Sequence, residues 1–202
     1  MAYPKHVQRI AELLGQLAGI GPRQAVRLAF SLLEKEDAYC TEFANLLQTM
    51  RTQTACCSIC FRSMETRGIP HCDICNASGR ASDKIMIVEK EPDVETMERS
   101  GVFNGLYHIT GGVISPLEKQ PGDKIRMREL FARVKTHPAR SSLEIIIATS
   151  NTMEGNQTAN YIERILQPLQ IKITRLGRGL STGAEIEYAD PLTLEAALKN
   201  RR

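Results

Sequence analysis

The sequence predicts an α+β protein built from several parts along one chain of 202 residues. Three observations lead to this prediction. Apolar residues recur at helical spacing over residues 7–51, two Cys-x-x-Cys pairs follow, and strands then alternate with helices to the end of the chain. A hydrophobic content of 42% is enough for packed cores. No apolar stretch approaches the roughly 18 residues that a membrane span needs.

The charge and the cysteine content limit the classes of function that the protein can have. The opening residues MAYPKHVQRIAELL carry charges throughout, so we expect no signal peptide and a cytoplasmic protein. A net charge of +3 excludes a polycation, so any nucleic-acid surface must arise from local clustering or oligomer geometry. Because the cytosol keeps disulfides reduced, the six cysteines point to thiols or metal.

The N-terminal region is expected to be helical. The first helix is indicated by apolar residues at helical spacing, which are Val7, Ile10, Leu13, Leu14 and Leu17. Two more helices are predicted, at 23–33 and at about 37–51. Between the first two, Gly19 and Gly21 flank an apolar residue, and a proline begins the next helix, which is typical of a helix–hairpin–helix.

Such a hairpin is suited to binding the DNA backbone. Gly19 and Gly21 let the backbone approach a phosphate closely, and the N–H groups of the next helix face the anion. Arg23 and Arg27 lie one turn apart on that helix, and we expect them to face DNA without reading its sequence. The alternatives are a plain helical corner with solvated arginines, or a contact with another protein.

The two cysteine pairs predict one structural zinc site. Eleven residues separate Cys-Ser-Ile-Cys from Cys-Asp-Ile-Cys, and two such knuckles complete a closed tetrahedral thiolate shell. The predicted ligands are Cys57, Cys60, Cys72 and Cys75. A redox dithiol and an iron–sulfur cluster are the alternatives. Cys56 and His71 could enter other registers of the site, and we expect both to be bystanders.

Beyond Ser82 the pattern indicates a parallel α/β sheet. The predicted strands are 85–88, 106–109, 144–149 and 171–176, and the predicted helices are 93–100, 123–135, 154–166 and 192–199. Between them, residues 111–122 are rich in Gly and Pro and are expected to form a structured loop. The Gly111-Gly112 pair is interpreted as a tight turn.

The ends of two predicted strands resemble a Toprim domain, the metal-binding fold of topoisomerases and primases. Glu89 closes the first strand, and ATSNTMEG (148–155) follows a later one. Catalytic Toprim proteins carry an Asp-x-Asp pair before the Glu-Gly, and the carboxylates hold Mg²⁺. Here Ser150 and Thr152 stand at the two aspartate positions, while Glu154 remains. Catalysis is therefore not expected.

The whole chain, in order, resembles the RecR family of bacterial recombination mediators. The resemblance rests on GIGPRQAVRLAF, the four cysteines, VEKEPD, YHITGGVISPL, ATSNTMEGNQTANYI and TRLGRGLSTGAEIEYADPLTL. The family usually has Asn-Pro-Thr at 150–152 and Glu at Asn156. It implies four parts: a helix–hairpin–helix DNA-binding region (1–54), a C4 zinc finger (55–78), a Toprim domain (79–178) and a Walker-B-like oligomerisation segment (179–202).

The resemblance implies a protein without catalytic activity in recombinational DNA repair. RecR-like proteins act with RecO, and in some lineages RecF, to help load RecA on single-stranded DNA, and they form ring-shaped tetramers. The acidic residues Glu89, Asp93 and Glu154 would meet a partner or bind Mg²⁺ weakly, and Mg²⁺ binding stays open. The alternative is a Mg²⁺-dependent Toprim nuclease or primase-like enzyme. The zinc finger would act as a strut between the hairpin and the sheet.

Overall fold

The computed structural model describes residues 3–115, 122 and 125–201. The chain forms two compact units, Met1–Ala55 and Cys56–Arg202. The first is helical, and the second contains the cysteines, the sheet and the C-terminal segment. Among the described helices, none combines the length and the apolar character needed to cross a bilayer.

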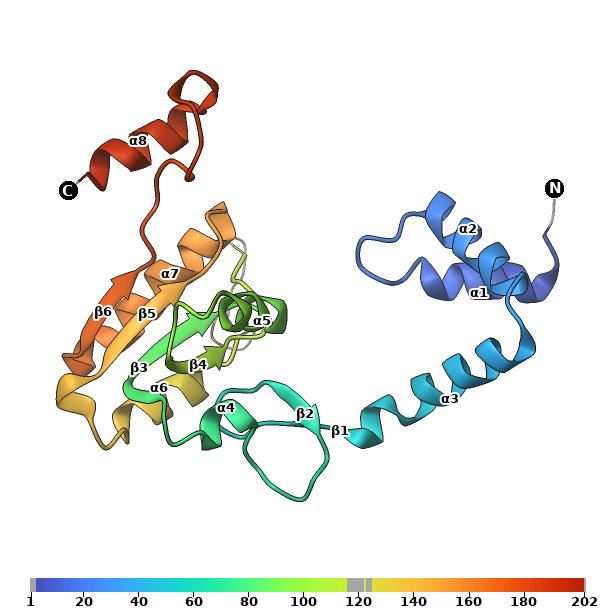
Figure 1. The fold of residues 1–202 in the computed structure, drawn as a ribbon, viewed down its shortest axis with the longest axis horizontal. Helices are drawn as coiled ribbons and strands as arrows, with labels where there is room; N and C mark the ends of the chain where they lie inside the picture. The colour runs from blue at the N-terminus through green and yellow to red at the C-terminus, as the bar shows by residue number, and fades with distance from the viewer. Residues whose placement is uncertain (1–2, 116–121, 123–124, 202) are drawn as a thin grey trace. The chain divides into compact units, whose positions relative to one another are not determined.

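In the helical unit, α1 (Lys5–Leu14) and α2 (Pro22–Leu33) form an antiparallel hairpin (Figure 1). Their contact is made by small side chains: Val7 and Ala11 on α1 meet Ala25 and Ala29 on α2. These residues are the buried core of the unit, and Ile20 from the connecting loop packs against them. The first helix ends at Leu14, so Leu17 lies beyond it and is exposed.

The third helix, α3 (Asp37–Gln53), buries none of its residues within the chain. It nevertheless carries a stripe of apolar side chains at helical spacing, with exposed fractions between 38% and 59%. The stripe consists of Tyr39, Phe43, Leu46, Leu47 and Met50. An amphipathic helix of this kind lacks a partner for its apolar face in the described chain.

The second unit begins with the cysteine segment. Strands β1 (Thr54–Cys56) and β2 (Ser63–Glu65) form a two-stranded sheet. One helical turn, α4 (Asp73–Asn76), starts directly after Cys72 and contains Cys75. Phe61 follows the first pair with a left-handed φ of 67°. This conformation, uncommon for a residue with a Cβ, turns the chain back immediately after Cys60.

The main sheet has four parallel strands in the order β4-β3-β5-β6. Their bounds are β3 (Ala81–Val88), β4 (Gly105–Ile109), β5 (Glu144–Ala148) and β6 (Lys172–Arg175). The chain passes from β3 to one side, then crosses to the other side with β5. The carboxyl ends of β3 and β5 therefore mark the point where the strand order reverses, which is the usual position of sites in such sheets.

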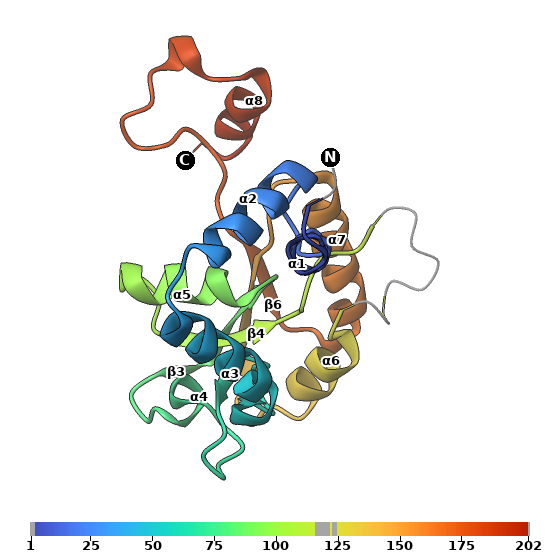
Figure 2. The ribbon, with the colours of Figure 1, turned by 90° about the vertical axis from the view of Figure 1, so that its right-hand side faces the viewer.

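Helices cover both faces of this sheet. Figure 2 shows α5 (Glu91–Ser100) on one face and α6 (Met127–Lys135) with α7 (Met153–Leu166) on the other. Ile85, Ile87 and Ile145 of the strands pack with the α6–α7 layer. On the opposite face, Met86 and Val88 share a core with Val94 of α5 and with the cysteines. The cysteine segment thus belongs to the hydrophobic core of the sheet.

The C-terminal segment follows β6. A 3₁₀ turn (Ile186–Tyr188) leads to α8 (Pro191–Lys199), and two further 3₁₀ turns, Arg140–Ser142 and Gln167–Leu169, precede β5 and β6. Asp190 caps α8 by accepting hydrogen bonds from the backbone N–H groups of Leu192 and Thr193, each at 3.0 Å. The carboxylate of Asp190 therefore serves as the N-terminal cap of α8.

The predicted α+β fold class is confirmed, with differences at element ends. Strand β3 begins at Ala81, four residues before the predicted start. The prediction missed this part of the strand because residues 82–84 are polar, although Lys84 still pairs with Glu144 of β5. Helix α5 begins at Glu91, with Pro92 in its first turn. The predicted helix from 123 starts at Met127 in the described chain. Most of the expected 111–122 loop lies outside the described residues.

Candidate functional sites

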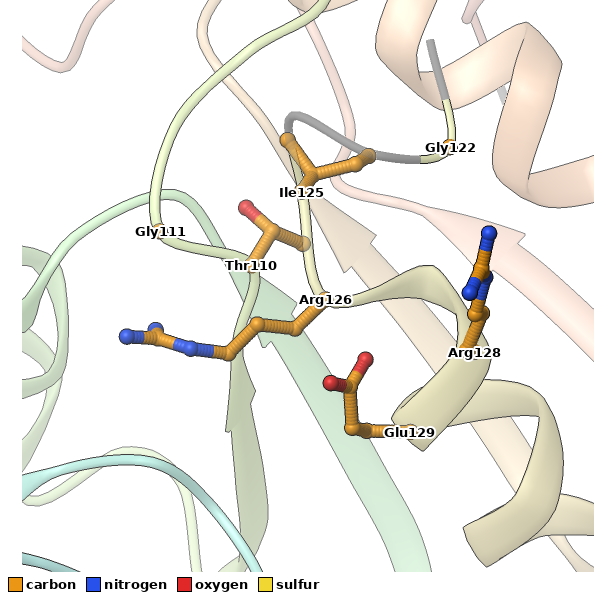
Figure 3. A pocket seen from close by; sticks show the side chains of 7 residues that line it. All are labelled: Thr110, Gly111, Gly122, Ile125, Arg126, Arg128 and Glu129. Carbon is orange, nitrogen blue, oxygen red and sulfur yellow. The ribbon is translucent and has the colours of Figure 1, made fainter. Parts of the chain in front are cut away.

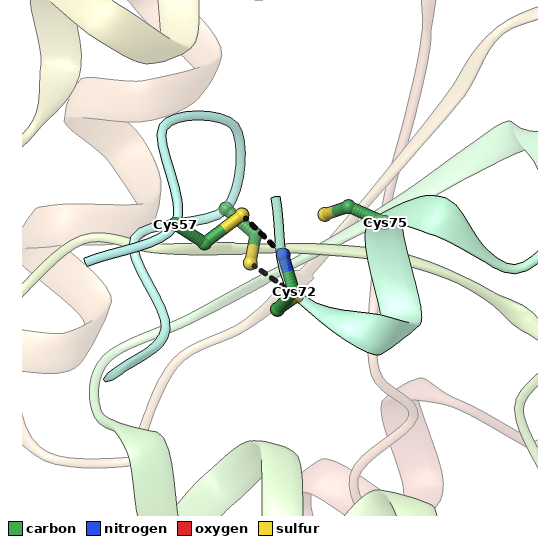
Figure 4. A group of neighbouring side chains, drawn as sticks. Cys57, Cys72 and Cys75 are labelled. Carbon is green, nitrogen blue, oxygen red and sulfur yellow. Dashed lines mark hydrogen bonds between the residues drawn. The ribbon is translucent and has the colours of Figure 1, made fainter. Parts of the chain in front are cut away.

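The four predicted zinc ligands lie together. Their sulfur atoms are all within 4.8 Å of one another, and Cys60 Sγ is 3.5 Å from Cys72 Sγ. With Zn–S bonds of about 2.3 Å, the sulfur atoms of a tetrahedral site are about 3.8 Å apart. Figure 4 shows the side chains of Cys57, Cys72 and Cys75 directed toward a common centre. The residues therefore fit a structural zinc ion, which would be enclosed by thiolates.

The cluster concentrates acidic groups in a buried place. Hydrogen bonds from the thiols of Cys60 and Cys75 hold the pKa of Cys72 far below its ordinary value. The hydrogen bond with Cys72 is also the main cause that raises the pKa of Cys60, to about 12. The backbone N–H of Cys72 donates to Cys57 Sγ at 3.3 Å. A divalent cation would relieve this crowding, since metal ligation requires the deprotonated thiolates.

The two residues expected to be bystanders stay outside the cluster. Neither Cys56 nor His71 belongs to the group of side chains close enough to share a metal ion. Cys56 is exposed at the end of β1. Desolvation is the main cause of the raised pKa of its thiol.

The first knuckle is docked on strand β4, at the edge of the sheet. The N–H of Ile109 donates to the carbonyl oxygen of Cys60 at 2.9 Å. The ring of Phe61 meets His108 edge-on at 5.3 Å, and the guanidinium of Arg126 lies 5.0 Å above the same ring. The knuckle therefore covers an edge that would otherwise leave backbone groups unpaired.

The Toprim-like position is occupied by internal hydrogen bonds. Glu89, directly after β3, is buried, and one of its carboxylate oxygens accepts the backbone N–H of Ser150 at 2.6 Å. The hydroxyls of Ser150 and Thr152 are 3.0 Å apart. Thr152 also caps α7 by accepting the N–H of Gly155 at 3.0 Å. Parallel pairing of β3 with β5 brings these residues together at the point of strand reversal.

The space around this position is closely filled. A Cβ on Gly155 would lie 2.1 Å from the carbonyl oxygen of Ser150, so only glycine fits there. Asp93 accepts the N–H of Lys90 at 2.9 Å in the capping box of α5. Glu154 is half-buried in the first turn of α7. In the described part of the chain, the cysteines form the sole group of three or more residues placed to hold a metal ion.

Beside it, the Gly111-Gly112 pair forms a turn. Both residues have positive φ, 87° and 153°, and the N–H of Gly111 donates to the carbonyl of Glu89 at 3.1 Å. A shallow pocket of about 310 Å³ opens here (Figure 3), lined by Thr110, Gly111, Gly122, Ile125, Arg126, Arg128 and Glu129. The guanidinium of Arg126, which lines this pocket, donates a hydrogen bond to the carbonyl oxygen of Ile109 at 3.2 Å. The turn interpretation is therefore supported by the backbone geometry.

In the helical hairpin, Gly19 and Gly21 lie in the loop between α1 and α2. Gly19 has a φ of 82°, and Gly21 caps α2. A Cβ on either glycine would meet no atom within 4 Å, so their backbone faces open space. Arg23 and Arg27 are exposed on α2, and neither forms an ion pair with a residue in the described part of the chain.

The basic residues near the C-terminus differ from this pair. Arg175 forms a two-point ion pair with Glu163, with contacts of 2.7 and 2.6 Å, and Lys172 lies 3.2 Å from Glu144. Arg178 donates to Asn156 at 2.7 Å. These side chains join β6 and the following loop to β5 and α7, so they are engaged within the chain.

Sequence reasoning missed the side chains that hold the cysteine knuckle to the sheet. Arg126 directly precedes α6, Arg133 lies in that helix and His108 lies on β4, so only the fold brings these side chains to the knuckle. Burial lowers the pKa of His108 to about 4, so its ring is neutral. The sequence signal available was weak, because an arginine within a helix is usually solvent-exposed.

Known proteins resemble this chain along its full length. Three family models match: "RecR, helix-hairpin-helix" at residues 7–51, "Toprim domain" at 83–177 and "RecR, C-terminal" at 179–202. The chain is 42% identical to the recombination protein RecR of Carboxydothermus hydrogenoformans, over 100% of this chain and 98% of that protein. It is 39% identical to RecR of Latilactobacillus sakei, over 100% and 99% of the two chains.

A third relative, RecR of Herpetosiphon aurantiacus, is 40% identical over 98% of this chain and 95% of that protein. The family matches fall on the helical hairpin, the parallel sheet and the C-terminal segment described above. The cysteine cluster stands between the first two matched segments. By this likeness over its entire length, the chain belongs to the RecR family of recombination proteins.

Proposed function

We propose that this protein is a DNA-binding clamp or adaptor of recombinational DNA repair that performs no catalysis. The observation that carries the proposal is the pair of exposed arginines beside the open hairpin. Arg23 and Arg27 lie one turn apart on α2, without ion-pair partners in the described chain, next to Gly19 and Gly21. Two free guanidinium groups and accessible backbone N–H groups suit a phosphate backbone of any sequence.

The Toprim-like position supports a role without catalysis. Phosphoryl-transfer chemistry at such a site needs carboxylates that hold Mg²⁺. Here Glu89 accepts a hydrogen bond from the chain itself, and two hydroxyls stand where aspartates would be. We propose that Glu89, Asp93 and Glu154 form part of a partner-binding surface instead. The partner would be RecO, with RecF in some lineages, in the loading of RecA on single-stranded DNA.

Exposed apolar faces support assembly into a ring, a homotetramer or a dimer. The stripe on α3 has no partner in the described chain. The segment 179–202, which we assign to oligomerisation, leaves Ile186, Tyr188 and Leu192 68%, 77% and 75% exposed. Apolar patches of this extent usually mark protein interfaces. A ring would also multiply two arginines per chain into a positive annulus, which reconciles DNA binding with a net charge of +3.

The four cysteines are proposed to bind one structural Zn²⁺ per chain. Their geometry leaves no ligand position for water, so the ion would stabilise the fold and take no part in chemistry. The proposed division is 1–54 for DNA binding, 55–78 for the zinc finger, 79–178 for the Toprim domain and 179–202 for assembly.

DNA binding by the wild type and an Arg23→Gln/Arg27→Gln variant tests the proposal. We expect the double substitution to weaken binding of labelled single- and double-stranded DNA at least about tenfold at low salt, and to flatten its salt dependence. Fluorescence anisotropy would measure both. The matched control is Arg99→Gln/Arg164→Gln, which removes the same charge from exposed positions on α5 and α7. Equal losses in both variants would contradict a specific role of the hairpin.

Two further measurements complete the test. Native mass determination with and without DNA should give an oligomer, and a stable monomer that binds DNA tightly would refute the clamp. Nucleic acids incubated with the protein and Mg²⁺ should stay intact. Turnover that requires Mg²⁺ and disappears in Glu89→Ala would restore the enzyme hypothesis.

A further inference from the structure

Arg133 of α6 is a half-buried cation, and one nitrogen of its guanidinium is fully buried. Its side chain is largely enclosed, and Nη2 is buried without a hydrogen-bond partner. Nη1 donates to the carbonyl oxygens of Tyr107 on β4, at 2.5 Å, and of Ile59, at 3.4 Å. No ion pair in the described part of the chain includes this guanidinium. A buried charge is costly unless an opposite charge lies nearby.

The contact with Ile59 places this cation against the cysteine cluster. Ile59 lies within the first knuckle, between Cys57 and Cys60, so Arg133 holds the backbone of the loop that carries two of the four ligands. Burial lowers the pKa of Arg133, and the charges of the four cysteine sulfurs act in the opposite direction. Arg133 therefore faces the place where the chain gathers its buried negative charge.

The charge of the filled site explains the need for such a cation. Four thiolates and one Zn²⁺ carry a net charge of −2, because four negative charges meet two positive ones. This dianion would sit in the hydrophobic core that joins the knuckles to the sheet, where an uncompensated charge is expensive. A guanidinium on the adjacent helix offsets part of that charge without becoming a ligand.

We propose that Arg133 is the positioning residue of the zinc centre: it neutralises part of the charge of the thiolate cluster and fixes the first knuckle against the sheet edge. The proposal rests on the assignment of the cysteines to zinc. It implies reciprocity, because the filled cluster also stabilises the burial of Arg133. Zinc loading and the position of α6 are therefore coupled.

Competition for zinc against a chromophoric chelator tests this, using the full-length protein. Arg133→Gln should bind one zinc per chain about 10–100-fold more weakly than the wild type. Arg133→Lys, which keeps the charge, should recover most of the loss. Arg164→Gln is the matched control, because it removes an exposed arginine of α7 whose guanidinium lies over Tyr161 of its own helix. Its affinity should stay within about twofold of the wild type.

A double-mutant experiment separates the effect of the charge of Arg133 from the effect of its hydrogen bonds. Cys75→His would keep four ligands while reducing the negative charge of the filled site from −2 to −1. In that background the effect of Arg133→Gln on zinc affinity should shrink several-fold.

The outcomes are distinct. An undiminished loss in the Cys75→His background, or Arg133→Lys as weak as Arg133→Gln, would overturn charge compensation. Unchanged affinity in Arg133→Gln would overturn any positioning role. A wild type that retains no zinc would refute the zinc assignment itself. If Arg133→Gln does not fold, the comparison of Arg133→Lys with the wild type still decides between the charge and the hydrogen bonds.

Discussion

The sheet unit contains two places with the residue types of a metal site, and they are built in opposite ways. The cysteine cluster gathers four sulfur atoms within 4.8 Å inside a hydrophobic core. The Toprim position, at the ends of β3 and β5, has one buried carboxylate, Glu89, which accepts a hydrogen bond from the backbone N–H of Ser150. Four acidic groups are crowded at the first place, whereas a single carboxylate is hydrogen-bonded by the chain at the second.

The two places differ in what holds their side chains together. A closed thiolate shell supplies its own charge and geometry, so an ion becomes part of the folded structure. At the Toprim position the hydroxyls of Ser150 and Thr152 lie within hydrogen-bond distance of each other, and Thr152 caps α7. The second site can then persist as a structural joint without an ion.

The largest expected effect comes from breaking the cysteine cluster. Cys72→Ala should lower the free energy of unfolding by at least roughly 3 kcal/mol, because the zinc-binding energy contributes directly to folding. Calorimetry and zinc analysis would measure the change. We expect assembly to suffer with folding, and DNA binding only as a consequence.

Cys56→Ala is the matched control for this prediction. It removes an exposed thiol adjacent to the cluster and should change stability by less than about 0.5 kcal/mol. If Cys72→Ala remained folded and oligomeric yet lost DNA binding, the cluster would have a direct DNA role and the strut interpretation would be wrong.

The sequence was informative wherever a local pattern determines the outcome. Spacing alone predicted the four cysteines that cluster, and hydrophobic periodicity predicted the helices and the four parallel strands. The start of β3 was missed because residues 82–84 are polar, and because Lys84 pairs with Glu144, which lies far along the chain. Helix α3 was recognisable, but nothing local indicates that its apolar stripe stays unburied in one chain.

The contacts around both sites could not be predicted from the sequence without knowledge of the fold. Glu89 and Ser150 are 61 positions apart, and their hydrogen bond follows from the pairing of β3 with β5. Arg133 reaches Ile59 across 74 positions. Such contacts join residues whose own neighbours in the sequence carry no sign of them, since strand order and helix placement are set by the packing of the whole unit.

Rebuilding the carboxylates tests whether the second site is only a joint. Ser150→Asp/Thr152→Asp should place three carboxylates together and lower the free energy of unfolding by about 1–2 kcal/mol without divalent cations. Millimolar Mg²⁺ should restore the loss, and melting temperature against Mg²⁺ concentration would measure it. Asp at 152 still caps α7. The neutral pair Ser150→Asn/Thr152→Asn should show no such dependence, and a Mg²⁺ response in the wild type would contradict the comparison.

The smallest expected effect on stability comes from changing Glu89, the hydrogen-bond acceptor of this position. Glu89→Gln keeps a carbonyl oxygen for the N–H of Ser150, so stability should change by less than about 0.5 kcal/mol. Glu89→Ala leaves that N–H without its acceptor and should cost about 1–2 kcal/mol. Urea titration of the two variants would measure the difference. Equal losses in both would mean that the negative charge of Glu89, and not its hydrogen bond, stabilises the joint, so the position would retain an electrostatic demand that a cation or a basic partner could meet.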